Sequence, residues 1–173
     1  MATVALALGS GGARGYAHIG AIQELEARGF EIVSISGTSV GAMVGGLYAA
    51  DKLPQFTEWV SNLKQTDVIR LLDPSFSAPG AIKAEKVMNK VRSMLGKARI
   101  EDLRIPYTAV ATDVMQSKEV WFQKGPLDAA IRASIAIPSL ISSVTIGGRL
   151  YVDGGVLNPL PLAPLASVKA DLV

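Results

Sequence analysis

The sequence predicts an α/β fold built around a mainly parallel central sheet. Two short apolar runs, residues 4–8 and 32–35, each lead into a glycine-rich turn, and a stretch with helical apolar spacing separates them. Short apolar runs bounded by glycine are typical of strands that are buried on both faces of a parallel sheet. Strand, helix and strand at this spacing form a βαβ unit, in which the two strands are parallel.

The first half of the chain supplies this unit. After the first strand, a helix is predicted over residues 14–28, because its apolar side chains recur about once per turn: Tyr16, Ile19, Ile22 and Leu25. Gly29 ends that helix, since glycine readily takes the left-handed conformation of a C-terminal cap. The second strand then leads through residues 37–41 into a helix that reaches about Ala50.

Helices and then strands are predicted for the second half. Residues 53–103 have a helical pattern, most clearly at residues 83–95, and we interpret residues 73–80 as a connecting loop. The elements predicted next are strands at residues 107–111 and 119–122 and a helix at residues 126–134. Residues 145–152 alternate around two glycines, which predicts a hairpin with Asp153 at its end.

The length and composition limit the class of protein. With 173 residues, 49% of them hydrophobic, the chain can bury one good core, so we expect a single domain over residues 1–173. Residues 169–173 look like the start of a strand, from which we expect the domain to be incomplete at its C-terminus. The net charge of +2, from 17 basic and 15 acidic residues, gives no reason to expect a nucleic-acid partner.

Location and cofactors are limited by what the sequence lacks. It contains no cysteine, which excludes disulfides, thiolate metal sites and cysteine nucleophiles and favours a cytoplasmic location. Residues 1–8 are apolar without a basic leader, and no apolar stretch approaches the roughly 20 residues that span a bilayer. The mean hydropathy of +0.33 leaves room for a membrane-facing patch, although a sheet buried on both faces explains it equally well.

Ser39 is the candidate nucleophile. It is the central residue of Gly37-Thr38-Ser39-Val40-Gly41, a G-x-S-x-G sequence between a predicted strand and a predicted helix. Such a sharp turn needs small flanking residues and exposes the serine hydroxyl at a helix N-terminus, where a developing negative charge is favoured. The alternative is a glycine-rich turn that contains a serine by chance.

A second glycine-rich segment, residues 9–15, follows the first strand. No Gly-Lys-Ser/Thr sequence follows it, which disfavours a phosphate-binding P-loop. The second strand ends in Ser36 and Gly37 without the acidic residue of a dinucleotide site, so no cofactor is expected. The segment therefore suits an oxyanion hole, in which backbone N–H groups face a developing anion.

The serine needs a base, and His18 and Asp153 are the candidates. His18 is the only histidine, but it lies in the first predicted helix and not in the late loop where α/β-hydrolases place theirs. Asp153 closes the predicted hairpin and is followed by two glycines, which leave it open to approach by the nucleophile. We favour Asp153, although an Asp-Gly-Gly sequence is often only a turn.

These three segments resemble, in type and in order, the motifs of the patatin-like phospholipase family. Residues 11–15 are similar to its oxyanion motif, residues 37–41 to its nucleophile elbow and residues 153–155 to its Asp-Gly-Gly/Ala motif. The matched glycines are Gly11, Gly12, Gly15, Gly37, Gly41, Gly154 and Gly155. Residues 111–113 and 132–138 also resemble the bacterial branch, which is similar to the catalytic domain of neuropathy-target esterases. The resemblance covers nearly the whole chain.

The resemblance implies a three-layer α/β/α fold and a serine acyl-ester hydrolase of phospholipase A or lysophospholipase type. Asp153 would take the proton of Ser39 directly, and the loop of Gly11 and Gly12, aided by the charge of Arg14, would hold the oxyanion. The implied substrate is a phospholipid or lysophospholipid. An apolar groove among the helices of residues 53–103 would suit its acyl chain, and peripheral contact with a membrane surface would be compatible with such a substrate. Ser10 departs from the family, which usually has glycine there, and would be strained at a positive φ.

Two other functions fit the same residues. A small-ester carboxylesterase or thioesterase could use the same dyad of Ser39 and Asp153. A catalytically silent, lipid-binding or regulatory protein would keep the fold without the reaction, a reading that Ser10 and the early C-terminus favour weakly. The sequence carries no pattern for a metal site and none that predicts an oligomeric state.

Overall fold

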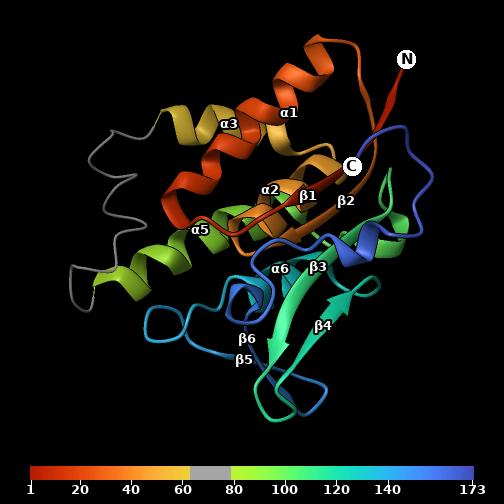
Figure 1. Ribbon diagram of the computed structural model, residues 1–173. Helices are drawn as coiled ribbons and strands as arrows, with labels where there is room; N and C mark the ends of the chain where they lie inside the picture. The colour runs from red at the N-terminus through yellow and green to blue at the C-terminus, as the bar shows by residue number, and fades with distance from the viewer. Residues whose placement is uncertain (63–78) are drawn as a thin grey trace.

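Strands and helices alternate along the chain as the apolar pattern predicts. The computed structural model describes residues 1–62 and 79–173 (Figure 1). Of the connecting loop predicted at residues 73–80, only the last residues, Pro79 and Gly80, lie among the described ones, and they begin helix α5. The helices are α1 (Ala17–Ala27), α2 (Val40–Ala49), α3 (Leu53–Ser61), α5 (Pro79–Leu95) and α6 (Leu127–Ser134). The strands are β1 (Thr3–Leu8), β2 (Glu31–Thr38), β3 (Tyr107–Asp113), β4 (Lys118–Phe122), β5 (Val144–Ile146) and β6 (Arg149–Asp153).

The sheet is parallel where the βαβ unit was predicted. Strand β1 pairs with β2 and β2 with β3 in parallel, so that Leu8 lies beside Gly37 and Gly37 beside Ala109. Strands β4 and β6 both pair with β3 in antiparallel fashion, and β5 pairs with β6. The α/β class is therefore confirmed. The glycine-rich turns lie at the ends of the parallel strands β1 and β2.

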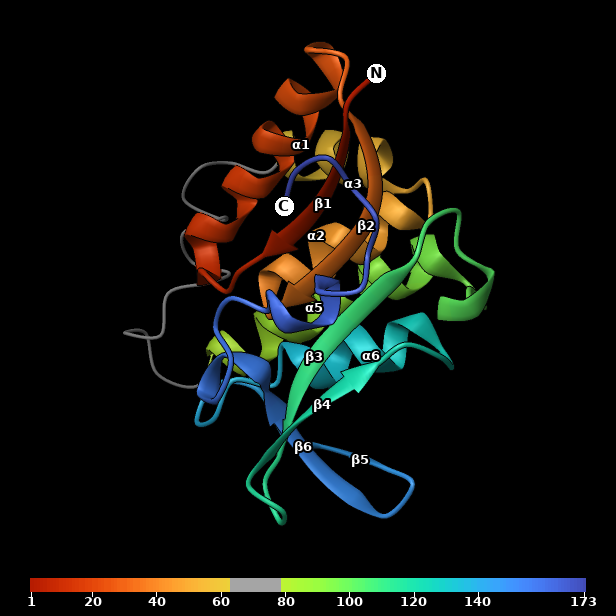
Figure 2. The same ribbon diagram turned by 45° about the vertical axis from the view of Figure 1, so that its right-hand side comes forward.

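The helices and the C-terminal segment cover different faces of the sheet. One cluster of buried apolar side chains joins the helices to β1, β2 and β3, and its largest members include Ile22, Ile35, Leu47, Phe56 and Ile131. Figure 2 shows α2, α5 and α6 behind the sheet and the C-terminal segment in front of β2. That segment includes the short 3-10 turn η4 (Ala163–Leu165), which contacts β1 and β2.

Strand β2 is longer and more polar than its apolar run predicts. Ser36 and Thr38 are fully buried, and they lie on the face covered by the C-terminal segment. The Ser36 hydroxyl donates to the carbonyl oxygen of Pro161, and the Thr38 hydroxyl donates to that of Asn158 at 2.9 Å. Irregular backbone leaves carbonyl groups without ladder partners, and buried hydroxyls on the adjacent strand satisfy them.

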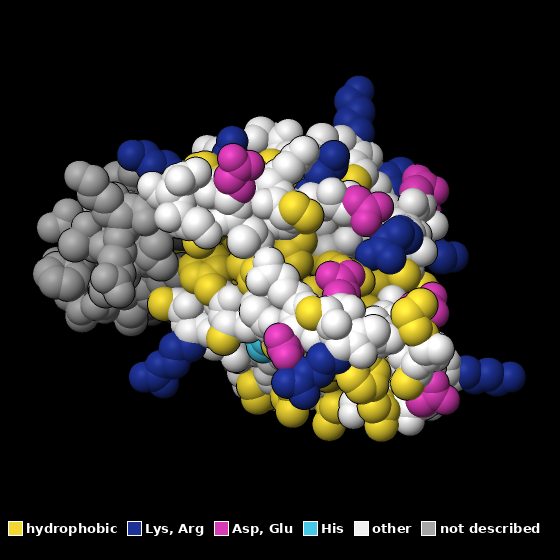
Figure 3. Space-filling view, turned by 90° about the horizontal axis from the view of Figure 1, so that it is seen from above, with side chains coloured by type: hydrophobic (Ala, Val, Ile, Leu, Met, Phe, Trp, Pro, Cys, Tyr) yellow, Lys and Arg dark blue, Asp and Glu magenta, His cyan; other side chains and the backbone are white. Residues whose placement is uncertain are grey.

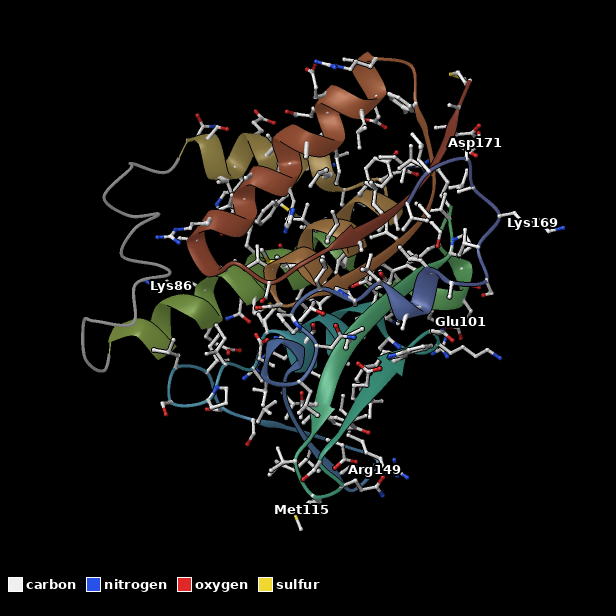
Figure 4. All side chains as sticks on the ribbon, viewed as in Figure 1. Lys86, Glu101, Met115, Arg149, Lys169 and Asp171 are labelled. Atoms are coloured by element: carbon white, nitrogen blue, oxygen red, sulfur yellow. The ribbon has the colours of Figure 1, made fainter. Side chains whose placement is uncertain are left out.

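The last residues of the chain meet β1. Val4 forms an isolated parallel bridge with Leu172, and the Asp171 carboxylate accepts hydrogen bonds from the Thr3 N–H at 2.7 Å and the Thr3 hydroxyl at 2.8 Å. Figure 4 shows Asp171 beside the beginning of β1. The strand-like pattern of residues 169–173 thus corresponds to a short parallel contact.

The predicted hairpin is present and positions Asp153. Gly147 and Gly148 have φ values of 56° and 77°, the left-handed conformations that a tight two-residue hairpin turn requires. Arg149 begins β6 at the tip of this hairpin, at the bottom of Figure 4. Strand β6 runs from that tip to Asp153, which pairs with Ala111 of β3 in the interior of the protein.

Candidate active site

Ser39 lies in the strained turn that the sequence predicts. It follows β2 directly, precedes α2, and has φ 58° and ψ −127° with only 2% of its surface exposed. A positive φ in a residue other than glycine typically costs about 1–3 kcal/mol, and such strain gathers at functional sites. The strand-to-helix turn is therefore confirmed, and the nucleophile candidate occupies its strained position.

Glycine is required on both sides of Ser39 because backbone segments meet there. A Cβ atom on Gly41 would lie 2.0 Å from the carbonyl oxygen of Leu8, at the end of β1. A Cβ atom on Gly37 would lie 2.5 Å from the Cα of Ala42 in the first turn of α2. Real atoms do not approach so closely, so any larger residue would push α2 away from the sheet.

Asp153 is a buried carboxylate at the end of β6. Its side chain accepts a hydrogen bond from the Gly155 N–H at 2.7 Å through Oδ1, whereas Oδ2 is buried without a hydrogen-bond partner among the described residues. Burial raises the pKa of the Asp153 carboxyl, and the Ser39 hydroxyl and the Gly155 amide partly oppose that shift. A buried oxygen without a partner is costly and marks a place where a proton or donor is expected.

Ser39 and Asp153 line one cleft. The Ser39 hydroxyl lowers the pKa of Asp153, yet no hydrogen bond of normal geometry joins the two side chains. Among the described residues, Oδ1 accepts from the Gly155 N–H and Oδ2 has no hydrogen-bond partner. Catalytic hydrogen bonds are often long without substrate and tighten when it binds. The cleft has a volume of about 380 Å³ and is lined by Ser10, Gly11, Gly12, Ser39, Ile137, Pro138, Asp153, Gly155 and Val156.

The glycine loop meets Ser39 and Asp153 at this cleft. Gly11 and Gly12 both line it, and Gly12 has a φ of 51° at the start of the 3-10 turn η1 (Gly12–Tyr16). Their N–H groups take part in none of the backbone hydrogen bonds found outside regular elements in the described ranges. Ser10 is not among the described residues with positive φ, so the strain considered for serine at this position is absent.

The other residues of the three motifs differ in their distance from the cleft. Arg14 is exposed and does not line it, and its backbone N–H donates to the Gly11 carbonyl oxygen at 3.0 Å. Gly15 packs under Val40, because a Cβ there would lie 2.7 Å from the Val40 Cγ1 atom. Gly154 lies against β3, where a Cβ would be 2.2 Å from the Val110 carbonyl oxygen.

The structure places His18 away from the cleft lining. Its Nε2 lies 2.8 Å from the Gly9 carbonyl oxygen, at the end of β1. Because a carbonyl oxygen can only accept, the Nε2–H of His18 donates this bond, and the side chain supports the backbone that leads into the glycine loop. His18 is not among the residues that line the cleft with Ser39.

Sequence reasoning missed the apolar side of the cleft and the buried support beneath it. Ile137, Pro138 and Val156 line the cleft, and Val156 is 54% exposed. Ser134 lies at the end of α6 with no exposed surface and contacts the Ser39 backbone. Residues 132–138 were noted for their resemblance, but a serine in a helix has no pattern that shows its contacts before the fold is known.

The wider surface shows no concentration of one charge on the face seen in Figure 3, where Lys and Arg side chains are scattered among acidic and apolar ones. Over residues 1–62 and 79–173, His, Asp and Glu side chains nowhere gather in the groups of three that could hold a metal ion. None of the helices in these same ranges has the length and hydropathy needed to cross a bilayer.

The fold and the cleft define an α/β protein with a strand-to-helix serine, a nearby buried aspartate and a glycine loop. The family model of patatin-like phospholipases matches residues 6–166, so the chain belongs to this family. An NTE family protein of Mycobacterium tuberculosis is 61% identical over 169 residues, which cover 98% of this chain and 47% of that protein. The chain thus spans about half the length of such relatives.

More distant relatives cover the chain equally well. Lysophospholipase NTE1 of Debaryomyces hansenii is 33% identical over 179 residues, covering 99% of this chain and 11% of that protein. The human patatin-like phospholipase domain-containing protein 6 is 32% identical, covering 99% of this chain and 13% of that protein. The crystal structure of VipD from Legionella pneumophila shares the fold, with a TM-score of 0.58 at 16% identity over 91% of this chain and 46% of that one.

Proposed function

We propose that this chain carries the active site of a serine acyl-ester hydrolase of phospholipase A or lysophospholipase type. The observation that carries the proposal is the shared cleft, where Ser39, Asp153 and the glycine loop meet. The strained backbone of Ser39 and the Oδ2 of Asp153, which has no hydrogen-bond partner in the described part of the chain, are both features that function explains better than stability.

In the acylation step, the Ser39 Oγ attacks the ester carbonyl carbon while its proton passes to the Asp153 carboxylate. The carbonyl oxygen becomes an oxyanion, which the N–H groups of Gly11 and Gly12 stabilise. The intermediate collapses as the C–O bond to the alcohol breaks, and the leaving oxygen takes the proton from Asp153. Water then attacks the acyl-serine, passes its proton to Asp153 and releases the fatty acid, after which the proton returns to Ser39.

Burial is what fits an aspartate to this role. An ordinary aspartate is a weak base, because its pKa lies far below neutral pH. Burial raises the pKa of Asp153, which makes the carboxylate a stronger proton acceptor. The Asp153 Oδ2, which accepts no hydrogen bond from residues 1–62 or 79–173, can receive the serine proton. The role of Arg14 in holding the oxyanion stays a prediction, because its exposed side chain does not line the cleft and would have to turn toward it.

The proposed substrate is an ester-linked fatty acyl chain of a phospholipid or lysophospholipid. One relative is named a lysophospholipase and another a patatin-like phospholipase domain-containing protein. The cleft offers apolar contacts from Ile137, Pro138 and Val156, as an acyl chain requires. The exposed side chains that we call the apolar rim follow the catalytic aspartate and suit contact with a lipid surface: Val156, Leu157, Leu160 and Leu162.

Substrate comparison tests this proposal. The purified protein is assayed with a long-chain lysophospholipid, a short-chain nitrophenyl ester and a long-chain acyl thioester, beside Ser39→Ala. We expect the highest kcat/KM for the lysophospholipid and no turnover of any substrate by Ser39→Ala. Preference for the short ester or the thioester would support the alternative hydrolases. A folded parent that turns over none of the three would support the catalytically silent alternative.

Contact with a lipid surface has its own test. Sedimentation with phosphatidylcholine vesicles is compared for the parent and a variant in which Leu157 and Leu160 are replaced by serine. We expect the variant to remain in the supernatant while its turnover of the short ester is unchanged. Equal sedimentation of the two proteins would show that the apolar rim does not contact lipid.

A further inference from the structure

The end of helix α6 lies directly beneath the nucleophile. Ser134 is the last residue of α6 and has no exposed surface. Its Oγ accepts a hydrogen bond from the Ser39 N–H at 2.9 Å and donates one to the Val110 carbonyl oxygen of β3 at 2.6 Å. Ser134 therefore joins the strained turn, the helix and the central strand through one hydroxyl.

The same short segment also holds the backbone of the proposed base. Two residues after Ser134, the carbonyl oxygen of the buried Ala136 accepts a hydrogen bond from the Asp153 N–H at 2.9 Å. Residues 134–136 thus bind the backbone N–H groups of both Ser39 and Asp153. No other segment among the described residues makes a hydrogen bond to both of these N–H groups.

The chemistry of a hydroxyl fixes the direction of the Ser134 contact. A serine hydroxyl has a single hydrogen, and the Val110 carbonyl oxygen takes it, so the lone pairs of Oγ are left to accept the Ser39 N–H. Ser39 precedes α2, and the first N–H groups of a helix have no partner within the helix. Without the Ser134 hydroxyl, the Ser39 N–H and the Val110 carbonyl would lose these partners in the interior.

We propose that Ser134 is a positioning residue that holds Ser39 in its reactive backbone conformation and sets its distance from Asp153. This inference rests on the proposed dyad. Ser134 does not line the cleft, so it acts through the backbone of Ser39 and not on the substrate. Loss of the hydroxyl lets the turn relax from its positive φ, which moves the Ser39 Oγ away from the carboxylate. A misplacement of about 1 Å in a catalytic group can cost about 100-fold in rate.

The test compares Ser134→Ala with a matched control on β2. Ser34 is also a buried serine whose hydroxyl donates to a backbone carbonyl, that of Pro106 at 3.3 Å, but it contacts neither member of the dyad. We expect Ser134→Ala to lower kcat for the short ester by at least about tenfold with KM within about twofold, while Ser34→Ala keeps both values. A folded Ser134→Ala protein with the parent kcat would overturn the proposal, as would an equal loss in Ser34→Ala.

Two further measurements keep the proposal testable. If Ser134→Ala does not fold, Ser134→Cys replaces it, because sulfur is a weak acceptor, and a parent kcat in this variant would overturn the proposal. Amide hydrogen exchange at Ser39 needs no catalysis, and we expect it to be at least about tenfold faster in the Ser134 variant than in the parent. Unchanged hydrogen exchange would show that Ser134 does not hold Ser39 and would overturn this inference. A parent protein that lacks esterase activity but protects the Ser39 amide from exchange would refute only the proposed function.

Discussion

The Thr38 hydroxyl donates a hydrogen bond to the Asn158 carbonyl oxygen at 2.9 Å. Thr38 precedes the candidate nucleophile, and Asn158 lies in the segment that follows Asp153. The Asn158 side chain in turn donates to the Glu119 carboxylate at 2.6 Å, which fixes the segment to β4. The relative position of the two proposed catalytic residues, Ser39 and Asp153, therefore depends on side-chain contacts with backbone carbonyls as well as on the sheet.

Replacing Thr38 by valine tests this link. The change keeps the shape of the side chain but leaves the Asn158 carbonyl without the hydroxyl donor, so we expect the free energy of unfolding to fall by about 1–3 kcal/mol. Urea denaturation measures the loss. Thr57→Val is the control, because the Thr57 hydroxyl donates to Leu53 within α3, and we expect a change within about 0.5 kcal/mol. Equal stability of the parent and Thr38→Val would contradict the structural importance of the link.

Gly41→Ala tests the close approach of α2 to β1. The added methyl group would meet the Leu8 carbonyl oxygen, so we expect a loss of more than about 3 kcal/mol or a failure to fold. Gly20→Ala is the matched control, because a Cβ at Gly20 in α1 meets no atom within 4 Å, and the better helix propensity of alanine should stabilise by about 0.5–1 kcal/mol. Thermal denaturation followed by circular dichroism compares them. Similar midpoints for the two variants would refute the packing described for Gly41.

The raised pKa of Asp153 predicts how stability depends on pH. The folded state favours the protonated Asp153 carboxyl. The stability that protonation gives the fold is complete below the pKa of Asp153 in the unfolded chain, and it is lost as pH rises through the pKa of Asp153 in the folded protein. Asp153→Asn stays neutral throughout. We therefore expect Asp153→Asn to melt at a higher temperature than the parent at neutral pH, with the difference shrinking in acid. A variant less stable than the parent at neutral pH would show that burial does not disfavour the charged form.

The same pKa predicts how the rate depends on pH. Only the ionised carboxylate can accept the Ser39 proton, so kcat/KM should rise with pH through an apparent pKa above the ordinary value of 3.8 and then level off. Initial rates with the short ester across acid and neutral pH measure this profile. A flat profile over the range in which the protein stays folded would exclude Asp153 as the base.

His18→Gln separates a dyad from a triad that uses the imidazole. A glutamine amide can still donate to the Gly9 carbonyl oxygen, so the loop should stay in place. We expect less than about a tenfold loss in kcat, whereas removal of a general base costs about 100-fold to 10,000-fold. A loss as large as that in Ser39→Ala would assign the base role to His18 and refute the dyad.

The parallel strands and the turn around Ser39 could be predicted because their signals are local. An apolar run, a glycine on each side of Ser39 and a helical pattern in α2 occupy adjacent residues, and the structure shows why each is needed. The hairpin that ends at Asp153 was equally local, since Gly147 and Gly148 supply its left-handed turn.

The support of the site could not be predicted in the same way. Ser134 contacts Ser39 across 95 residues of sequence, and Thr38 contacts Asn158 across 120. Such contacts join a hydroxyl to a backbone group, and almost any residue can supply a backbone group. Only the folded chain shows which hydroxyl meets which carbonyl or N–H. The contacts of Ser36 and Thr38 at the end of β2 could not be predicted for the same reason.

The central claim is that Ser39 is a nucleophile activated by Asp153, and reaction with a fluorophosphonate probe tests it most directly. Intact mass after reaction is compared for the parent, Ser39→Ala and Asp153→Asn, with circular dichroism as the check on folding. The account predicts one adduct on the parent, none on Ser39→Ala and labelling at least about 100-fold slower on Asp153→Asn. A folded parent that gains no adduct, or an adduct that persists in Ser39→Ala, would contradict it.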